Sequence, residues 1–379
     1  MSKMKAVVKV KPEKGGAELA YVDIPTLNPD EVLIRVQATS ICGTDVHIYE
    51  WNPWAQRRIG EKRLPQILGH EVAGEIVEVG PAVKSIKKGD YVSSETHIYD
   101  PGDLTSLLGQ RHIGEHMQIL GVDRDGVFAE YVMVPERVCW VNDRSIPPEF
   151  ASVQEPLGNG VYAVLGEDAD VAGKSMVIVG DGPTALFATG VARACGVAKI
   201  ILVGYSDFNM DIAKKMGADY ILDMKSSTME ERHKFILEQT DGYGVDISLE
   251  MVGGEVPITE AFTHLRKGGR LTAFGITTEA AVPIDYNNWI VFKGAQIHGI
   301  NGRKVFDTWY RMRGLLAGER LDISPIVTHV MALEAYEKGF EMLLAEPRLA
   351  AKIVLFPDHG ELKAAKERLS EKRDMPAAD

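Results

Sequence analysis

Three short segments of the chain carry side chains that could bind a metal ion. The first contains Cys42, the second His70 followed by Glu71, and the third Glu155. One thiolate, one imidazole and carboxylates form a donor set suited to a zinc ion that keeps a coordination position open for chemistry. These residues lie far apart in the sequence, so their spacing alone does not establish a site. Taken singly, an isolated cysteine is more often a core residue and a His-Glu pair more often an exposed one.

A glycine-rich segment, residues 180–185, could hold the phosphates of a dinucleotide. It reads G-x-G-x-x-A, follows an apolar strand over 175–180 and opens a helix. Glycines allow a tight turn and let the backbone approach a pyrophosphate, which then lies at the helix N-terminus. An ordinary glycine-rich turn would match the same pattern, but the strand–turn–helix context favours nucleotide binding by Gly180, Gly182, Pro183 and Thr184. Asp181 fits less well, because a carboxylate near phosphates is unfavourable unless it points away.

The end of the next strand bears on the choice between NAD and NADP. An acid here commonly binds the ribose 2′-hydroxyl of NAD, but this chain has Gly204. The absence of an acid removes the repulsion that excludes a 2′-phosphate, although no Arg or Lys follows immediately to hold one. Tyr205, Ser206 and Asn209 could hydrogen-bond such a phosphate, or Asp207 could reach the ribose from the loop. Both cofactors stay open, with a slight preference for NADP.

The elements that must position these side chains change character along the chain. Residues 1 to about 155 show short alternating apolar segments separated by Gly, Pro and Asp, which is typical of a small β-rich domain. After residue 156, apolar strands alternate with helices of about 12 residues, which predicts a parallel doubly wound sheet. We therefore expect an α/β protein with a β-rich catalytic domain (1–156 and 301–356), a Rossmann cofactor domain (157–300) and a solvated charged tail (357–379).

Composition excludes several classes of function. The 379 residues are 45% hydrophobic and 25% charged, with a net charge of -12, which argues against nucleic acid or an anionic membrane as a partner. No apolar run approaches the roughly 18 residues needed to span a bilayer, and we expect a cytoplasmic protein. Only Cys42, Cys139 and Cys195 are present, so a four-cysteine zinc site is impossible.

The combined motifs resemble one known family. The segments CGTDVH, GHE, GDYV, EPLGNG and GDGP, taken in order, resemble the zinc-containing medium-chain alcohol dehydrogenase superfamily over roughly residues 4–356. Within it, the segments around residues 39–51, 121–135 and 299–310 are most similar to the branch that oxidises L-threonine. This resemblance implies a GroES-like domain, a Rossmann domain and hydride transfer from a threonine-like secondary alcohol to NAD(P), giving 2-amino-3-ketobutyrate.

The resemblance also implies roles for individual residues. Cys42, His70 and Glu71 match the zinc ligands, and Glu155 matches a fourth ligand or a carboxylate that exchanges with water. Asp45 would orient a ligand imidazole. The catalytic positions implied around the metal are Thr44 and His47 as a proton relay, His97 near the substrate, and Glu155. The implied dinucleotide contacts are Thr184, Phe274, Gly275, Ile276, Ile300 and Asn301.

The sequence departs from the family in the lobe that often holds a second, structural zinc. The four cysteine positions fall at Asp100, Asp103, Ser106 and Gly114. Two carboxylates and a serine do not make a tight structural site, so we expect one catalytic zinc and no structural zinc. We expect His112 and His116 nearby to be solvated rather than metal-bound.

Alternatives remain for the substrate and the class of protein. The same zinc chemistry would serve a polyol, sugar or cyclitol dehydrogenase, and a non-catalytic nucleotide-binding protein is a more remote hypothesis. We expect a small-molecule substrate and a homo-oligomer, either a dimer or a tetramer.

Overall fold

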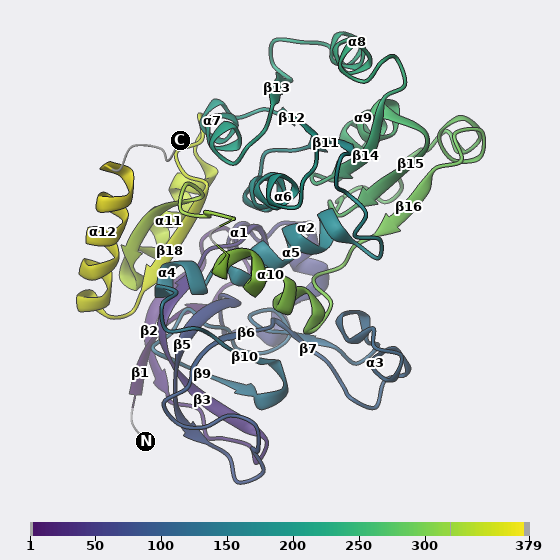
Figure 1. Cartoon of the computed structure of the whole chain (residues 1–379). Coiled ribbons are helices and arrows are strands. Elements are labelled where there is room, and N and C mark those ends of the chain that lie inside the picture. Colours follow the sequence, from purple (N-terminus) through teal and green to yellow (C-terminus); the bar gives the residue numbers. More distant parts are fainter. Residues whose placement is uncertain (1–2, 319, 375–379) are drawn as a thin grey trace. The chain divides into compact units, whose positions relative to one another are not determined.

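The computed structural model describes residues 3–318 and 320–374 (Figure 1). Contacts divide the chain into two compact units. The first unit runs to Glu155 and also includes Val327–Ala345 and the chain from Lys352 onward. The second unit is Pro156–Ile326 with Glu346–Ala351. Among the described residues, no helix is both long and apolar enough to cross a membrane.

The first unit is built from largely antiparallel sheets, which confirms the predicted β-rich domain. Its largest sheet has the order β10-β6-β5-β3-β18-β17, with β9 also paired to β3. A smaller sheet has the order β2-β1-β4, and β7 pairs with β8. The strands are β1 (Lys3–Lys9), β2 (Ala17–Asp23), β3 (Glu31–Ser40), β4 (Gln66–Ile67), β5 (Glu71–Val79), β6 (Tyr91–Ser94), β7 (His97–Ile98), β8 (Gln118–Ile119), β9 (Tyr131–Pro135), β10 (Cys139–Val141), β17 (Val327–Ala332) and β18 (Lys352–Phe356).

Helices of the first unit are short, apart from the last two. The α-helices are α1 (Gly43–Glu50), α2 (Pro53–Arg58), α3 (Leu104–Leu107), α4 (Pro148–Ala151), α11 (Tyr336–Leu344) and α12 (His359–Asp374). The 3-10 turns are η1 (Glu61–Arg63), η2 (Arg111–Ile113), η3 (Glu136–Val138) and η5 (Leu333–Ala335).

The charged C-terminal segment is not a solvated tail over its described part. In α12, Leu362, Ala365 and Leu369 are buried and recur at helical spacing. Both carboxylate oxygens of Glu149 in α4 accept hydrogen bonds from Arg368, at 2.8 and 2.7 Å. The many charged residues of this segment hide a narrow apolar stripe, and for that reason its docking was not predicted.

The second unit confirms the predicted doubly wound sheet. Six parallel strands have the order β13-β12-β11-β14-β15-β16. Figure 1 shows α6 and α7 on one side of this sheet and α8 and α9 on the other. The strands are β11 (Ser175–Val179), β12 (Lys199–Gly204), β13 (Tyr220–Asp223), β14 (Val245–Glu250), β15 (Leu265–Ala273) and β16 (Gln296–Gly299). The helices are α5 (Gln154–Leu165), α6 (Pro183–Ala194), α7 (Asp207–Lys215), α8 (Met229–Gln239), α9 (Glu255–His264), α10 (Asp307–Ala317) and a π-helical turn, η4 (Tyr286–Val291).

Alternation along the strands decides which helices they contact. Val177 and Val179 of β11 pack in one cluster with Ile236 of α8 and Phe262 of α9. Successive strand residues point to opposite faces, so the residues between them face the other helix layer. Both faces of the central strand β11 are therefore buried, as its continuous apolar run indicates.

Residues 301–326 lie with the second unit, whereas the sequence had placed them in the catalytic domain. Trp309 and Met312 of α10 are fully buried. Leu321 packs so closely against α6 that a Cβ added at Gly190 would lie 2.8 Å from its Cδ1. Apolar packing thus assigns residues 301–326 to the second unit. The mixed composition of this segment did not indicate that packing.

Candidate active site

Three of the four predicted metal ligands come together in the first unit. The potential ligand atoms of Cys42, His70 and Glu71 all lie within 4.8 Å of one another. Strands β3 and β5 pair antiparallel with Ser40 opposite Glu71, so the residues just after β3 meet those just before β5. The register of one strand pair therefore brings a cysteine next to a histidine 28 positions further along the chain.

Asp45 holds the geometry around Cys42 and His70. It occupies the third position of α1, and its Oδ2 accepts a hydrogen bond of 2.9 Å from the Cys42 backbone N–H. Its Oδ1 lies 3.3 Å from His70 Nδ1, at ion-pair distance but without good hydrogen-bond alignment. This carboxylate leaves His70 Nε2 as the imidazole atom available to a metal, which is the predicted role of Asp45.

The electrostatics of this group suit a cation. Burial alone would lower the pKa of His70, but the negative charges of Asp45 and Cys42 outweigh it and raise the pKa well above its usual value. This buried imidazole beside Asp45 and Cys42 therefore lies where positive charge is favoured. A thiolate, an imidazole and a carboxylate are also donors that zinc accepts, so the residues present fit the predicted metal.

The carboxylate oxygens of Glu71, which a metal ion could bind, already accept hydrogen bonds that the sequence did not reveal. Lys352 at the start of β18 donates from Nζ to Glu71 Oε1 at 2.6 Å and to the Ile41 carbonyl at 3.0 Å. Ser40 Oγ donates to the other oxygen of Glu71. Burial alone would lower the pKa of Lys352, but Glu71 and Cys42 raise it. The lysine opens an apolar strand, and such a position gave no sign that it would be fully buried.

The remaining catalytic predictions lie on separate elements. Glu155 belongs to α5, is 4% exposed and is near enough to contribute to the raised pKa of Lys352. It is not part of the three-residue ligand group found among the described residues. His97 in β7 is buried, and its backbone N–H donates to Glu95 Oε1 at 3.0 Å. Thr44 lies in the first turn of α1.

His47 follows Thr44 by almost one turn of α1 and is held by Asn52. Asn52 Oδ1 accepts a hydrogen bond from the Ala55 N–H, so its Nδ2 faces the imidazole and lies 2.9 Å from His47 Nδ1. Part of the side chain is exposed, and Trp54 lies beside it with ring centroids 6.0 Å apart. Burial of the rest lowers the pKa of His47 below its usual value of 6.5. A neutral imidazole near neutral pH is suited to accepting a proton.

The predicted dinucleotide loop has the expected local geometry. Gly180 has φ +117, a conformation that L side chains rarely adopt, and Gly182 is the N-cap of α6. A Cβ added at Gly182 would meet nothing within 4 Å, so the helix N-terminus is open to an approaching group. Pro183 and Thr184 form the first turn of α6. The strand–turn–helix arrangement can present backbone N–H groups to a pyrophosphate.

The other predicted cofactor contacts follow the ends of neighbouring parallel strands. Phe274, Gly275 and Ile276 come directly after β15, and Ile300 and Asn301 after β16. These strands run parallel to β11, so the segments lie at the same edge of the sheet as the glycine-rich loop. Ligands of open α/β sheets bind outside this carboxyl edge, which is where the predicted residues are.

The loop after β12 differs from the prediction in two ways. Asp181 turns its carboxylate toward this loop, where Oδ2 accepts hydrogen bonds from the N–H groups of Tyr205 (2.9 Å) and Ser206 (2.6 Å). Asn209 is fully buried, because it lies on the inner side of α7. It is therefore not at the surface where a 2′-phosphate contact was predicted. Tyr205 and Ser206 remain at the surface, and Asp207 forms an ion pair of 2.7 Å with Lys225.

A second group of potential ligand atoms occurs in the lobe after β7. Asp100, Asp103 and His116 offer atoms within 4.8 Å of one another. Asp103 Oδ1 lies 2.5 Å from His116 Nδ1, and Asp103 Oδ2 accepts a 2.9 Å hydrogen bond from the His116 N–H. The expectation of two solvated histidines is confirmed for His116, whose side chain is 76% exposed although it bonds to Asp103. It is wrong for His112, because η2 turns that residue inward, where it is buried.

Comparison with known proteins places these features in context. Residues 28–143 match the model of the alcohol dehydrogenase GroES-like domain, and residues 183–318 match that of zinc-binding dehydrogenases. The L-threonine 3-dehydrogenase of Pyrococcus furiosus is 47% identical over 90% of this chain and 96% of its own length. That of Thermococcus kodakarensis is 44% identical over 94% and 99%.

Solved structures show the same fold. The crystal structure of 2R,3R-butanediol dehydrogenase from Bacillus subtilis superposes with a TM-score of 0.82 at 28% identity, covering 94% of this chain and 100% of that one.

Proposed function

The chain belongs to the zinc-containing medium-chain alcohol dehydrogenase superfamily, and on that premise we propose that it oxidises L-threonine at its secondary alcohol. It is a zinc-dependent oxidoreductase that uses NAD(P). The observation that carries the choice of substrate is the identity of 40–47% to L-threonine 3-dehydrogenases over nearly the whole chain. The product of such a reaction is 2-amino-3-ketobutyrate.

The metal would be held by Cys42 and His70, with Glu71 and Glu155 as the carboxylates available to complete its coordination. When bound, zinc would supply Lewis-acid chemistry that acidifies the substrate hydroxyl, and the nicotinamide would supply the acceptor for the hydride. Lys352 and Ser40 hold Glu71 in place beside Cys42 and His70. Asp45 keeps the His70 ring in the orientation that ligation requires.

The proton released from the hydroxyl would leave through α1. Thr44 supplies a hydroxyl that can both accept and donate, and His47 accepts the proton at the surface. Its lowered pKa keeps the imidazole neutral before transfer. His97 and Glu155 are the further side chains that we assign to the substrate region. We assign to the dinucleotide Gly180, Gly182, Pro183, Thr184 and residues 274–276 and 300–301.

A substrate panel tests this function. We expect absorbance of reduced nicotinamide to rise with L-threonine and much more slowly with D-threonine, sorbitol, inositol or 2,3-butanediol. Activity with a polyol and none with L-threonine would contradict the proposed substrate and leave the dehydrogenase chemistry standing.

We further propose that each chain holds one catalytic zinc and none in the lobe, where Asp103 and His116 bond to each other. Cys42→Ser should lower bound zinc from roughly one to near zero per chain and abolish turnover. Asp103→Ala is the matched control, and we expect it to leave the zinc content unchanged. A loss of zinc on Asp103→Ala, measured by plasma mass spectrometry, would show that the lobe binds metal.

A further inference from the structure

A carboxylate from the glycine-rich loop occupies two backbone N–H groups of the loop after β12. Asp181 comes from the glycine-rich loop after β11, yet its Oδ2 accepts the N–H groups of Tyr205 and Ser206 after β12. Ser206 is the N-cap of α7. Free N–H groups at a helix N-terminus attract anions, and a phosphate is the anion most often found there. In this chain an anion built into the protein already takes both N–H groups.

Gly204, the position that commonly carries an acid, has no free space for a larger side chain. A Cβ added at Gly204 would lie 2.8 Å from Met210 Cγ, 3.0 Å from Leu202 Cδ2 and 3.2 Å from Asp181 Cβ. Any larger side chain at this position would displace the packing of β12 against α7. The absence of an acid at Gly204 therefore reflects crowding and does not by itself indicate a site open to phosphate.

The charges around the loop also oppose a second phosphate. Asp207 is the first residue of α7, Asp223 is the last residue of β13, and Lys225 is a nearby cation. Lys225 Nζ forms an ion pair of 2.7 Å with Asp207, and its backbone N–H donates to Asp223 Oδ1 at 2.9 Å. The charge of Lys225 is thus already paired with Asp207, and Asp181 adds a further carboxylate at the backbone N–H groups of the loop. A 2′-phosphate placed here would add two negative charges to this group.

We propose that Asp181 selects NAD by excluding the 2′-phosphate of NADP. It does so by occupying the amides of the β12–α7 loop and by placing a negative charge beside the adenosine ribose. This reverses the slight preference for NADP that Gly204 suggested. The proposal rests on the proposed function only in requiring that the carboxyl edge of the sheet binds a dinucleotide, and it does not depend on the substrate.

Direct binding measurements test the proposal without turnover. Titration of the wild-type holoenzyme with NADH and NADPH, followed by fluorescence, should show at least about tenfold tighter binding of NADH. Asp181→Asn keeps an acceptor for the two N–H groups but removes the charge. We expect it to tighten NADPH binding about tenfold while NADH binding changes by less than about twofold.

The matched control is Asp211→Asn. Asp211 is an exposed residue of α7 that pairs with Lys214 at 2.9 Å, so the net charge changes equally but away from the loop. We expect no change in the ratio of the two affinities. Asp181→Ser is a second, smaller variant, should Asp181→Asn fail to fold.

Three outcomes would overturn the inference: equal affinities of the wild type for NADH and NADPH, tighter NADPH binding by the wild type, or equal effects of the Asp181 and Asp211 variants. Failure of both dinucleotides to bind would instead contradict the proposed function, so the two failures are distinguishable.

Discussion

At the scale of single residues, the buried pair of Glu71 and Lys352 is the main addition to the sequence-based site. Both side chains are at most 1% exposed, and removing one partner of such a pair leaves a buried charge without compensation. The pair also decides how freely Glu71 can serve as a metal ligand, since its oxygens already accept bonds from Lys352 and Ser40.

Lys352→Met should destabilise the first unit by about 3–5 kcal/mol, because Glu71 would remain as a buried carboxylate without its partner. Urea unfolding followed by circular dichroism measures the effect. The double variant Lys352→Met with Glu71→Gln should recover much of the loss. Equal destabilisation in the single and double variants would contradict the pairing.

His47 leads to a prediction about pH. Burial lowers its pKa from the usual 6.5, and the proposed relay would require a neutral imidazole. We therefore expect kcat/KM to stay high as pH falls to 6.5 and to decline only below it. His47→Gln should reduce kcat/KM by about 100-fold and remove this acid limb. A limb that persists in the variant would assign it to another group.

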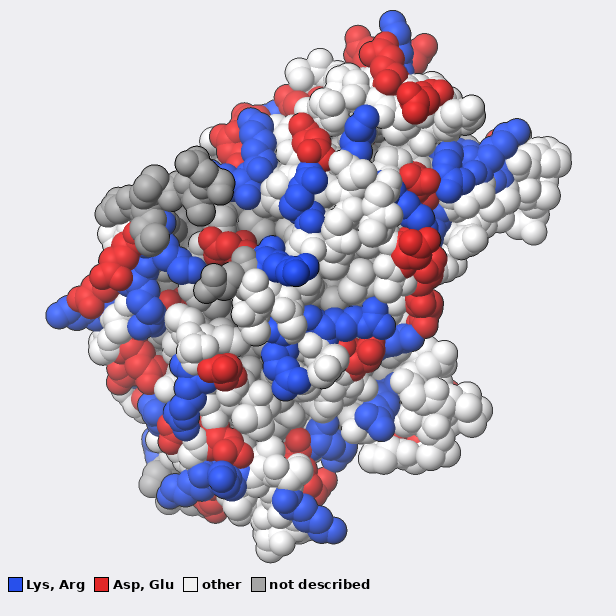
Figure 2. Space-filling view, viewed as in Figure 1, with Lys and Arg blue, Asp and Glu red and all other residues white. Residues whose placement is uncertain are grey.

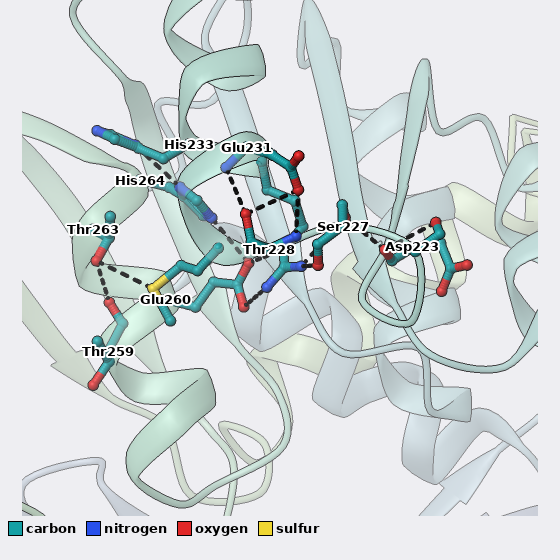
Figure 3. A network of polar contacts seen from close by, with 12 residues as sticks. Asp223, Ser227, Thr228, Glu231, His233, Thr259, Glu260, Thr263 and His264 are labelled. Carbon is teal, nitrogen blue, oxygen red and sulfur yellow. Dashed lines mark hydrogen bonds and ion pairs between the residues drawn. The ribbon is translucent and has the colours of Figure 1, made fainter.

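At the scale of elements, a buried polar network joins α8 to α9. Arg232 Nη2 donates to Glu260 Oε2 at 2.9 Å, and His264 Nε2 lies 3.2 Å from Glu260 Oε1. His233 stacks on His264 with Nδ1 atoms 3.3 Å apart, and Figure 3 shows the contacts running from His233 through His264 to Glu260. Lys293 also contributes positive charge to this group.

The two histidines are held neutral in the folded state. Burial lowers the pKa of His233 and of His264, and the positive neighbours lower both further. Burial alone would raise the pKa of Glu260, but its hydrogen bonds from His264 and Arg232 outweigh burial and lower it. As pH falls through 6.5 the unfolded chain takes up protons first, so stability is lost on the acid side. Glu260 adds a further loss below its usual pKa of 4.5.

His233→Asn should therefore flatten the acid dependence of stability. Asparagine can still donate toward His264 but cannot be protonated. The fall in Tm of the second unit between pH 7.5 and 5.5, measured by calorimetry, should be smaller in the variant than in the wild type. His359→Asn, at an exposed position of α12, is the control and should leave the fall unchanged. Parallel curves for all three proteins would argue against the network as the cause.

At the scale of the whole molecule, charge and apolar surface have opposite effects on association. The net charge of -12 favours separation of chains, and Figure 2 shows both signs of charge interspersed over the visible face. One edge of the parallel sheet is different. β16 is the outermost strand, with Ile297 44% exposed, and Phe292 just before it is 68% exposed. The apolar side chains that are exposed in this region are Ile284, Tyr286, Val291, Phe292 and Ile297.

We propose that the chain forms a homo-oligomer through this edge, because an exposed apolar edge strand offers unpaired backbone groups to a second copy. Light scattering should give a mass that is a multiple of 41.6 kDa. Ile297→Lys should lower that mass, whereas Leu349→Lys, at another exposed aliphatic residue, should not. An unchanged mass in the Ile297 variant would show that the interface does not include this edge.

Local patterns were enough to predict much of the architecture and of the site. Alternating and continuous apolar runs indicated the β-rich and parallel-sheet parts, because burial on one or two faces imposes these periods on the sequence. The glycine-rich turn and the group of Cys42, His70 and Glu71 were likewise identified from residue types and family resemblance. These features depend on residues close in sequence or on motifs that carry their own chemistry.

Only the tertiary structure decided which distant side chains form ion pairs and hydrogen bonds with each other. Lys352 is 281 positions from Glu71, and nothing in a lysine at the start of a strand indicates that it will be buried beside a carboxylate. Asp181 was recognised in the sequence as a misfit, but its direction toward Tyr205 and Ser206 depends on how two parallel strands lie side by side. The docking of α12 was not predicted either, because its narrow apolar stripe lies among many charged residues. The sequence determines local conformation and the kinds of chemistry that its side chains can perform. Hydrogen bonds and ion pairs between distant residues exist only once folding has brought those residues together.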